Sequence, residues 1–167
     1  KKITPRVNDL TFNTVKNFDY ILICYETYLH IKTLKKIYSN KLNIKIFIEK
    51  PLSNKKINIS KMYKNIYVGY NLRFHPVIQY IKKNINLDKV LNISIRCMTN
   101  LRDWRKRDYS KSYSASKKLG GGVHFDLSHE IDYLIWLFGS PIKYNIFKKK
   151  LSNLLIDSID TFILSGI

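Results

Sequence analysis

The most informative segment of the chain is Leu119-Gly-Gly-Gly-Val-His-Phe-Asp-Leu-Ser-His-Glu-Ile-Asp-Tyr-Leu-Ile-Trp-Leu-Phe-Gly139. A triple glycine opens it, apolar residues then recur at helical spacing, and Gly139 is expected to end the helix. This spacing predicts two faces with different tasks. The polar face carries Asp126, His129, Glu130 and Tyr133. The apolar face, expected to pack on a core, carries Leu127, Ile131, Leu134, Ile135 and Phe138.

The polar face has two interpretations. At this spacing, the carboxylate of Asp126 and the imidazole of His129 are within reach of each other, as an acid/base site requires. The alternative is an ordinary amphipathic helix with a solvated polar face and a capping aspartate.

The first third of the chain has the pattern of a βαβ unit. The apolar run 20–24 is long enough for a buried strand, and residues 28–39 repeat apolar side chains at helical spacing. Residues 44–48 and 66–69 predict two further strands. Strand, helix and strand in this order predict parallel pairing with a right-handed crossover, and therefore an α/β fold.

Polar residues follow each predicted strand, at the carboxyl ends where ligands bind to such sheets. The three groups are Tyr25-Glu26-Thr27, Glu49-Lys50-Pro51 and Tyr70-Asn71-Leu72-Arg73-Phe74.

Three motifs occur in order along the chain: Phe47-Ile-Glu-Lys-Pro-Leu-Ser53, Val68-Gly-Tyr-Asn-Leu-Arg-Phe-His-Pro76 and Gly120-Gly-Gly-Val-His-Phe-Asp-Leu-Ser-His-Glu-Ile-Asp132. Together they resemble the Gfo/Idh/MocA family of NAD(P)-dependent oxidoreductases, from about Phe18 to Ile167. The resemblance implies a partial Rossmann-like parallel sheet followed by part of an α+β substrate domain with an open mixed sheet. Residues 1–70 would be the C-terminal part of the dinucleotide-binding domain. Residues 71–167 would be the N-terminal part of the substrate and oligomerisation domain.

The same resemblance implies an oxidoreductase that uses NAD or NADP and acts on the hydroxyl or carbonyl group of a sugar, polyol or sugar nucleotide. Its catalytic residues would be Lys50, His129 and Asp126, with Lys50 contacting both the nicotinamide ribose and the substrate hydroxyl. Many relatives carry the carboxylate four residues before the histidine, where this chain has Phe125. Asp126 is therefore expected to be an orienter or an acid/base partner of His129, with Glu130 as a substitute.

Further residues are assigned to cofactor binding on the same basis: Tyr25, Glu26, Glu49, Lys50, Pro51, Asn71, Arg73, Trp104 and Arg105. Arg73 would either clamp a ligand or make an interdomain ion pair. Trp104 and Arg105 would reach toward cofactor or substrate, or belong to a surface loop. Tyr113 lies in a segment expected to close over a sugar, and His30 is expected to pack rather than to catalyse.

The chain departs from the family pattern at its ends. No Gly-x-Gly-x-x-Gly turn, the usual phosphate cradle, occurs in it. It does not begin with Met, and it ends on a strand pattern. We therefore expect it to be an internal piece of a longer protein. A catalytically inactive remnant or binding module of the same fold is the first alternative.

Composition limits the other possibilities. Of 167 residues 45% are hydrophobic, which is enough for a core, but no apolar run approaches the roughly 20 residues of a membrane span. Cys24 and Cys97 are expected to be buried thiols of a cytoplasmic protein rather than a disulfide. The chain has no metal-ligand motif, since His129-Glu130 lacks the second histidine of a His-Glu-x-x-His site.

The formal net charge of +18 raises the second alternative, a basic nucleic-acid-binding protein. Aromatic and basic residues do alternate in the segment 102–109. However, the lysines are scattered, and no nucleic-acid-binding motif is present. The expected partner is a sugar-like small molecule, with no membrane. The resemblance also implies a homo-oligomer through the open face of the second sheet.

Overall fold

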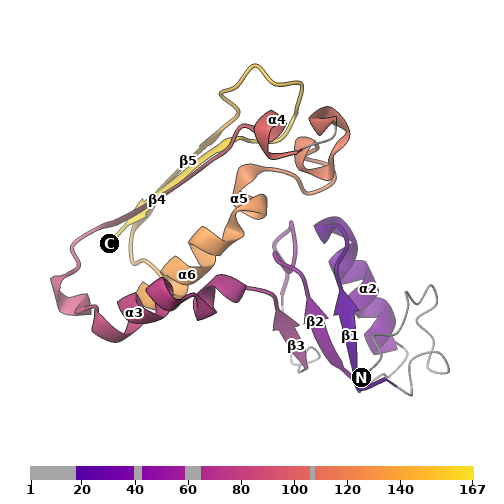
Figure 1. Ribbon diagram of the computed structural model, residues 1–167, viewed down its shortest axis with the longest axis horizontal. Helices are drawn as coiled ribbons and strands as arrows, with labels where there is room; N and C mark the ends of the chain where they lie inside the picture. The colour runs from indigo at the N-terminus through magenta and orange to yellow at the C-terminus, as the bar shows by residue number, and fades with distance from the viewer. Residues whose placement is uncertain (1–17, 40–42, 59–64, 106–107) are drawn as a thin grey trace. The chain divides into compact units, whose positions relative to one another are not determined.

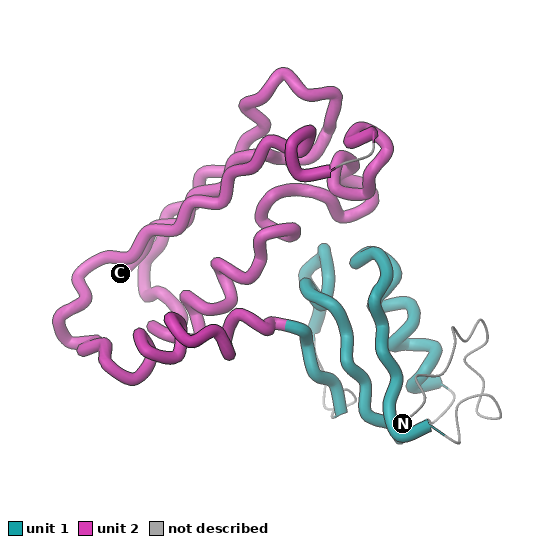
Figure 2. Tube along the Cα trace, viewed as in Figure 1, with its two compact units in different colours: residues 1–69 teal, residues 70–167 magenta. Residues whose placement is uncertain are grey.

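The computed structural model describes residues 18–39, 43–58, 65–105 and 108–167. The chain forms two compact units that divide after Gly69 (Figure 2). Unit 1 ends there, and unit 2 begins at Tyr70.

The described residues of unit 1 form a three-stranded parallel sheet and one long helix (Figure 1). Its elements are β1 (Tyr20–Ile23), α2 (Thr27–Ser39), β2 (Lys45–Ile48) and β3 (Ile66–Val68). The strand order is β1-β2-β3, and Ile46 of β2 pairs with Ile21 on one side and Ile66 on the other. The predicted strands and helix are confirmed to within one or two residues, as is their parallel pairing.

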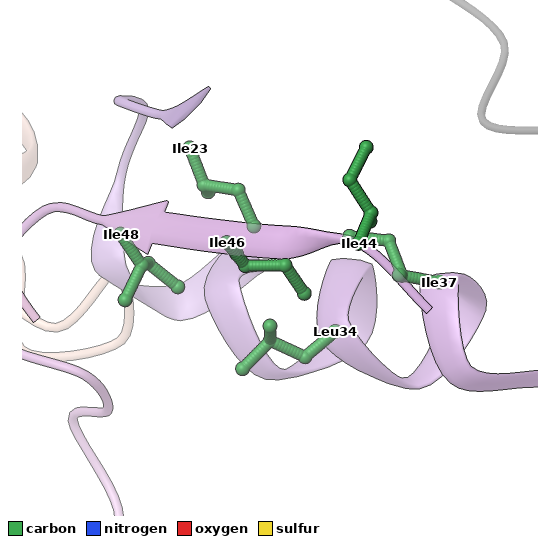
Figure 3. Packing of buried hydrophobic residues seen from close by; sticks show 6 residues of the cluster. All are labelled: Ile23, Leu34, Ile37, Ile44, Ile46 and Ile48. Atoms are coloured by element: carbon green, nitrogen blue, oxygen red, sulfur yellow. The ribbon is translucent and has the colours of Figure 1, made fainter. Parts of the chain in front are cut away.

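The core of unit 1 lies between β1, β2 and α2 (Figure 3). Its buried members are Ile23, Leu34, Ile37, Ile44, Ile46 and Ile48. The isoleucines of β2 alternate with exposed residues, and Leu34 and Ile37 are three apart on α2, so one face of each element is apolar. Each fully buried isoleucine contributes about 1.5–3 kcal/mol relative to leaving it exposed.

The strand over residues 20–24 was expected to be buried throughout, and this part of the prediction is wrong. Tyr20 and Leu22 are about half exposed, because α2 covers one face of the sheet and no other described element covers the opposite one. Cys24, predicted to be buried, follows the end of β1 and is exposed. Cys97 is buried as predicted, and both thiols are free.

Unit 2 consists of short helices and an antiparallel sheet. Its helices are η1 (Asn71–Phe74), α3 (Pro76–Asn84), η2 (Leu87–Lys89), α4 (Leu101–Trp104), η3 (Tyr109–Lys111), η4 (Tyr113–Ala115), α5 (Val123–Asp126) and α6 (Ser128–Phe138). Its strands are β4 (Ile93–Met98), β5 (Tyr144–Lys149) and β6 (Thr161–Gly166), in the order β4-β6-β5. A parallel sheet followed by a separate second sheet confirms the predicted α/β fold class.

The helices α5 and α6 cover one face of this second sheet. The shared core contains Ile95, Cys97, Val123, Leu134, Phe162 and Leu164. Burial, together with the negative charge of Glu130, raises the pKa of the Cys97 thiol to about 11. Cys97 is therefore an inert core residue at neutral pH.

The single helix predicted from the glycine run to Phe138 is in fact two helices. Leu127, at φ −105° and ψ 37°, separates α5 from α6. Gly139 caps α6 with φ +83°, as predicted. Ile135, expected on the buried face, is 43% exposed. Ile135 lies about 100° around the helix from the buried Leu134, on the side away from Leu137, which is also buried.

Within the described residues, no helix is long and apolar enough to cross a membrane.

Candidate functional site

The carboxyl edge of the unit 1 sheet brings two of the predicted polar groups side by side. Residues 25–27 follow β1, and Glu49, Lys50 and Pro51 follow β2. The backbone N–H of Glu49 donates to the carbonyl of Ile23 at 2.8 Å, which extends the β1–β2 pairing into this edge. The Lys50–Pro51 peptide bond is cis. Glu49 and Lys50 are half-buried, whereas Glu26 is exposed and Tyr25 is 41% exposed.

The His30 side chain connects these two turns by hydrogen bonding. Its ring is fully buried in α2, with Nδ1 3.0 Å from the carbonyl oxygen of Pro51 and Nε2 2.9 Å from that of Tyr25. Carbonyl oxygens only accept hydrogen bonds, so a neutral ring donates to one of them at a time. His30 thus has a structural role, which agrees with the expectation from sequence.

In unit 2, Asp126 lies at the centre of a polar cluster, which we call the Asp126 cluster (Arg105, Tyr113, Ser114 and Asp126). Asp126 and Ser114 are buried, and Arg105 and Tyr113 are half-buried. The Tyr113 hydroxyl donates to Asp126 Oδ1 at 3.0 Å, and Arg105 Nη2 lies 3.9 Å from the same oxygen. Arg105 Nη2 also donates to Ser114 Oγ at 2.7 Å. Sequence reasoning singled out Asp126, Arg105 and Tyr113 separately, without connecting them.

His129 is in the first turn of α6, half-buried, and has an aromatic neighbour. The Tyr70 ring meets its imidazole edge-on, with ring centroids 5.8 Å apart. Burial raises the pKa of the Tyr70 phenol, so that its hydroxyl stays protonated at neutral pH. A neutral phenol and an imidazole therefore lie together at the start of α6.

Arg73, predicted to clamp a ligand or to join two domains, is paired within unit 2. Its Nε and Nη2 donate to the two carboxylate oxygens of Asp132 at 2.7 and 2.5 Å. The guanidinium also lies 5.9 Å from the ring centroids of Tyr70 and Trp136. This two-pronged bond fastens η1 to α6. Asn71, the first residue of η1, is exposed.

Trp104 is the last residue of α4 and is 41% exposed. The Arg105 guanidinium lies 4.7 Å from the Trp104 centroid and 5.3 Å from that of Tyr113. Trp104 also lines a shallow depression together with Met98, Thr99, Asn100, Asp103 and Leu127. Among the described residues, no group of three or more His, Cys, Asp or Glu side chains is arranged to hold a metal ion.

Comparison with known proteins identifies the kind of domain present. Residues 82–161 match the model of the C-terminal alpha/beta domain of an oxidoreductase family. No curated protein sequence matches the chain.

Two solved structures illustrate the fold similarity. The WlbA (WbpB) dehydrogenase of Thermus thermophilus, in complex with NAD and alpha-ketoglutarate, is 18% identical with a TM-score of 0.63, over 90% of this chain and 52% of that one. The WlbA dehydrogenase of Bordetella pertussis, in complex with NADH and UDP-GlcNAcA, is 18% identical with a TM-score of 0.65, over 90% of this chain and 45% of that one. The chain thus spans about half the length of these proteins, and at this identity the similarity establishes the fold.

Proposed function

This chain belongs to the Gfo/Idh/MocA oxidoreductase family, and from that membership we propose that the full-length protein is an NAD(P)-dependent oxidoreductase acting on a sugar, polyol or sugar nucleotide. The observation that carries the proposal is the Glu49-Lys50-Pro51 turn at the carboxyl edge of a parallel sheet, followed by the family's C-terminal domain. The NADH and UDP-GlcNAcA held by a WlbA relative support this cofactor class and a nucleotide-linked sugar.

The residues of unit 1 fit one end of a dinucleotide. Two adjoining turns at the sheet's carboxyl edge offer the phenol of Tyr25, two carboxylates and the ammonium group of Lys50. These groups suit the hydroxyls of a ribose and the amide of a nicotinamide ring. A glycine-rich phosphate turn does not occur in this sequence, so the pyrophosphate would need residues from elsewhere. We assign Tyr25, Glu26, Glu49, Lys50 and Pro51 to cofactor binding.

Unit 2 would supply further contacts. We assign Trp104 and Arg105 to the cofactor or substrate, because a half-exposed ring and a guanidinium stacked on it suit a planar or anionic group. Asn71 is assigned to cofactor binding because it is an exposed amide. Arg73 keeps its assignment to this region, and its bond to Asp132 supports a role in holding η1 in place.

The nicotinamide ring, when bound, exchanges a hydride with the carbinol or carbonyl carbon. The protein's own groups handle the proton. Lys50 and His129 would take the proton from the substrate hydroxyl during oxidation and return it during reduction. Asp126, the last residue of α5 and three positions before His129 of α6, would orient the imidazole or share the proton.

The test is turnover of the full-length protein with NAD or NADP and a panel of nucleotide sugars, free sugars and polyols. Lys50→Ala and His129→Ala are each expected to lower kcat by about 10²- to 10⁴-fold, as for the loss of a general acid or base. Lys35→Ala, an exposed lysine on α2, is the matched control and should keep normal turnover. Near-normal turnover in Lys50→Ala would refute its role. Binding of cofactor without turnover of any substrate would favour an inactive binding module.

A further inference from the structure

We propose that Tyr113 is a positioning residue that holds the Asp126 carboxylate in place, with Arg105 as the charge that completes the arrangement. The inference rests on the proposed function, because Asp126 is one of the three residues assigned to proton transfer. It adds a residue, Tyr113, that does not itself touch the reacting atoms.

The first support is the environment of Asp126. Its side chain is only 4% exposed, although an ionised carboxylate at such a depth requires hydrogen bonds or a counter-charge. The Tyr113 hydroxyl supplies a hydrogen bond of 3.0 Å to Oδ1, and the Arg105 guanidinium supplies a positive charge 3.9 Å from the same atom. A donor and a cation on one oxygen fix the plane of the carboxylate as well as its charge.

The second support is that Arg105 is itself held on several sides. Its Nη2 donates to Ser114 Oγ at 2.7 Å and to the Tyr113 hydroxyl oxygen at 3.3 Å. Its guanidinium stacks between the rings of Trp104 and Tyr113. The phenol of Tyr113 therefore contacts both the carboxylate and its counter-charge. Removing that one hydroxyl would loosen both.

The third support is the rigidity of the backbone that carries Tyr113. Ser158 Oγ donates to the carbonyl of Ser114 at 2.7 Å, and both serines are almost fully buried. On the other side, Gly121 packs so closely that an added Cβ would lie 2.4 Å from the carbonyl oxygens of Tyr113 and Ser114. The phenol thus projects from a backbone fixed on two sides, which suits a residue that positions another.

The ionisation state of the phenol agrees with this role. Burial, followed by the negative charge of Asp126, raises the pKa of the Tyr113 phenol. The hydroxyl consequently remains protonated at neutral pH and can donate to the carboxylate.

The first experiment uses Tyr113→Phe in the full-length protein, which removes the hydroxyl and keeps the ring. We expect kcat to fall by about tenfold or more, the size of a lost hydrogen bond to a charged group. The KM for the cofactor should change by no more than about twofold. In an Asp126→Asn background, Tyr113→Phe should cause little further loss.

The matched control is Tyr109→Phe. The Tyr109 hydroxyl accepts a hydrogen bond from the backbone N–H of Leu155, outside the Asp126 cluster, so this variant should keep the wild-type kcat. Wild-type kcat in Tyr113→Phe, or a fall in kcat matched by a large rise in the KM for the cofactor, would overturn the proposal.

A second measurement does not depend on activity. Urea unfolding of wild type, Tyr113→Phe, Asp126→Asn and the double variant gives the coupling between the two side chains. Unfolding is followed by hydrogen exchange of the unit 2 amides, which reports on this unit alone. We expect the unfolding equilibrium constant of the double variant to differ by about threefold or more from the value calculated by combining the effects of the two single variants. Additive effects would overturn the proposal even if no substrate is turned over, whereas coupling without turnover would refute the proposed function alone.

Discussion

Gly121→Ala tests the close packing on which the Asp126 cluster depends. The added Cβ would lie 2.4 Å from the carbonyl oxygens of Tyr113 and Ser114, and 2.6 Å from the carbonyl carbon of Ser114. Ordinary contact begins near 3.4 Å, so the two segments must separate by about 1 Å. The neighbours are backbone atoms held by the bond from Ser158, and they yield less readily than a flexible side chain. We expect a loss of about 3 kcal/mol in the free energy of unfolding, the upper end for overpacking.

Gly139→Ala is the matched control for this prediction. No atom lies within 4 Å of a Cβ built there, but φ is +83° and ψ is −177°, so the cost is backbone strain alone, about 1–3 kcal/mol. Both variants are compared by urea unfolding, followed by hydrogen exchange of the unit 2 amides. Gly121→Ala should also lose turnover, because the displaced segment carries Tyr113, whereas Gly139→Ala should not. A change below about 0.5 kcal/mol in Gly121→Ala would refute the reasoning, since that is the size of a neutral surface substitution.

Three further predictions concern stability. Burial, and secondarily the charge of Lys148, lowers the pKa of His124 from its usual 6.5 to about 4. As the pH falls, the unfolded chain therefore binds a proton at this position before the folded protein does, and the folded protein loses stability between pH 6.5 and about 4. His124→Phe should reduce this loss and should change the pH dependence of the free energy of unfolding little above pH 6.5. Arg73→Ala and Asp132→Ala should each destabilise unit 2, with a coupling of about 1 kcal/mol in a double-mutant cycle, because the guanidinium is partly exposed and screened; purely additive losses would contradict the pairing. Leu34→Ala should lower the free energy of unfolding of unit 1 by about 2–5 kcal/mol, because Leu34 is fully buried. The loss should appear as faster hydrogen exchange of the α2 amides, and unchanged exchange would exclude the packing in Figure 3.

Local patterns were sufficient to predict the regular elements of unit 1. Strands and helix there follow from short-range periodicity, so residues 20–23, 45–48 and 66–68 could be assigned from sequence. Periodicity does not show what covers each face. This is why the exposure of Tyr20 and Leu22 was missed, although the strand itself was correct.

The helix break at Leu127 could not be predicted, because residues 123–138 keep an apolar rhythm across it. The bond between Tyr113 and Asp126 spans 13 positions, and that between Arg73 and Asp132 spans 59. Such contacts depend on the tertiary path of the chain rather than on spacing. Gly121 was the available signal, since glycine in a run can mark a close backbone approach, but the sequence does not show that residues 113 and 114 are the approaching segment.

Binding of a nicotinamide dinucleotide is tested most directly by titrating the full-length protein with NAD and with NADP and measuring the heat of binding by calorimetry. We expect stoichiometric binding of one of the two dinucleotides at micromolar to millimolar concentration, weakened in Lys50→Ala and unchanged in Lys35→Ala. Absence of binding to both, in a folded protein, would contradict it. If the same protein were then retained on DNA in a salt-dependent way, the charge of +18 would indicate a nucleic-acid-binding function instead.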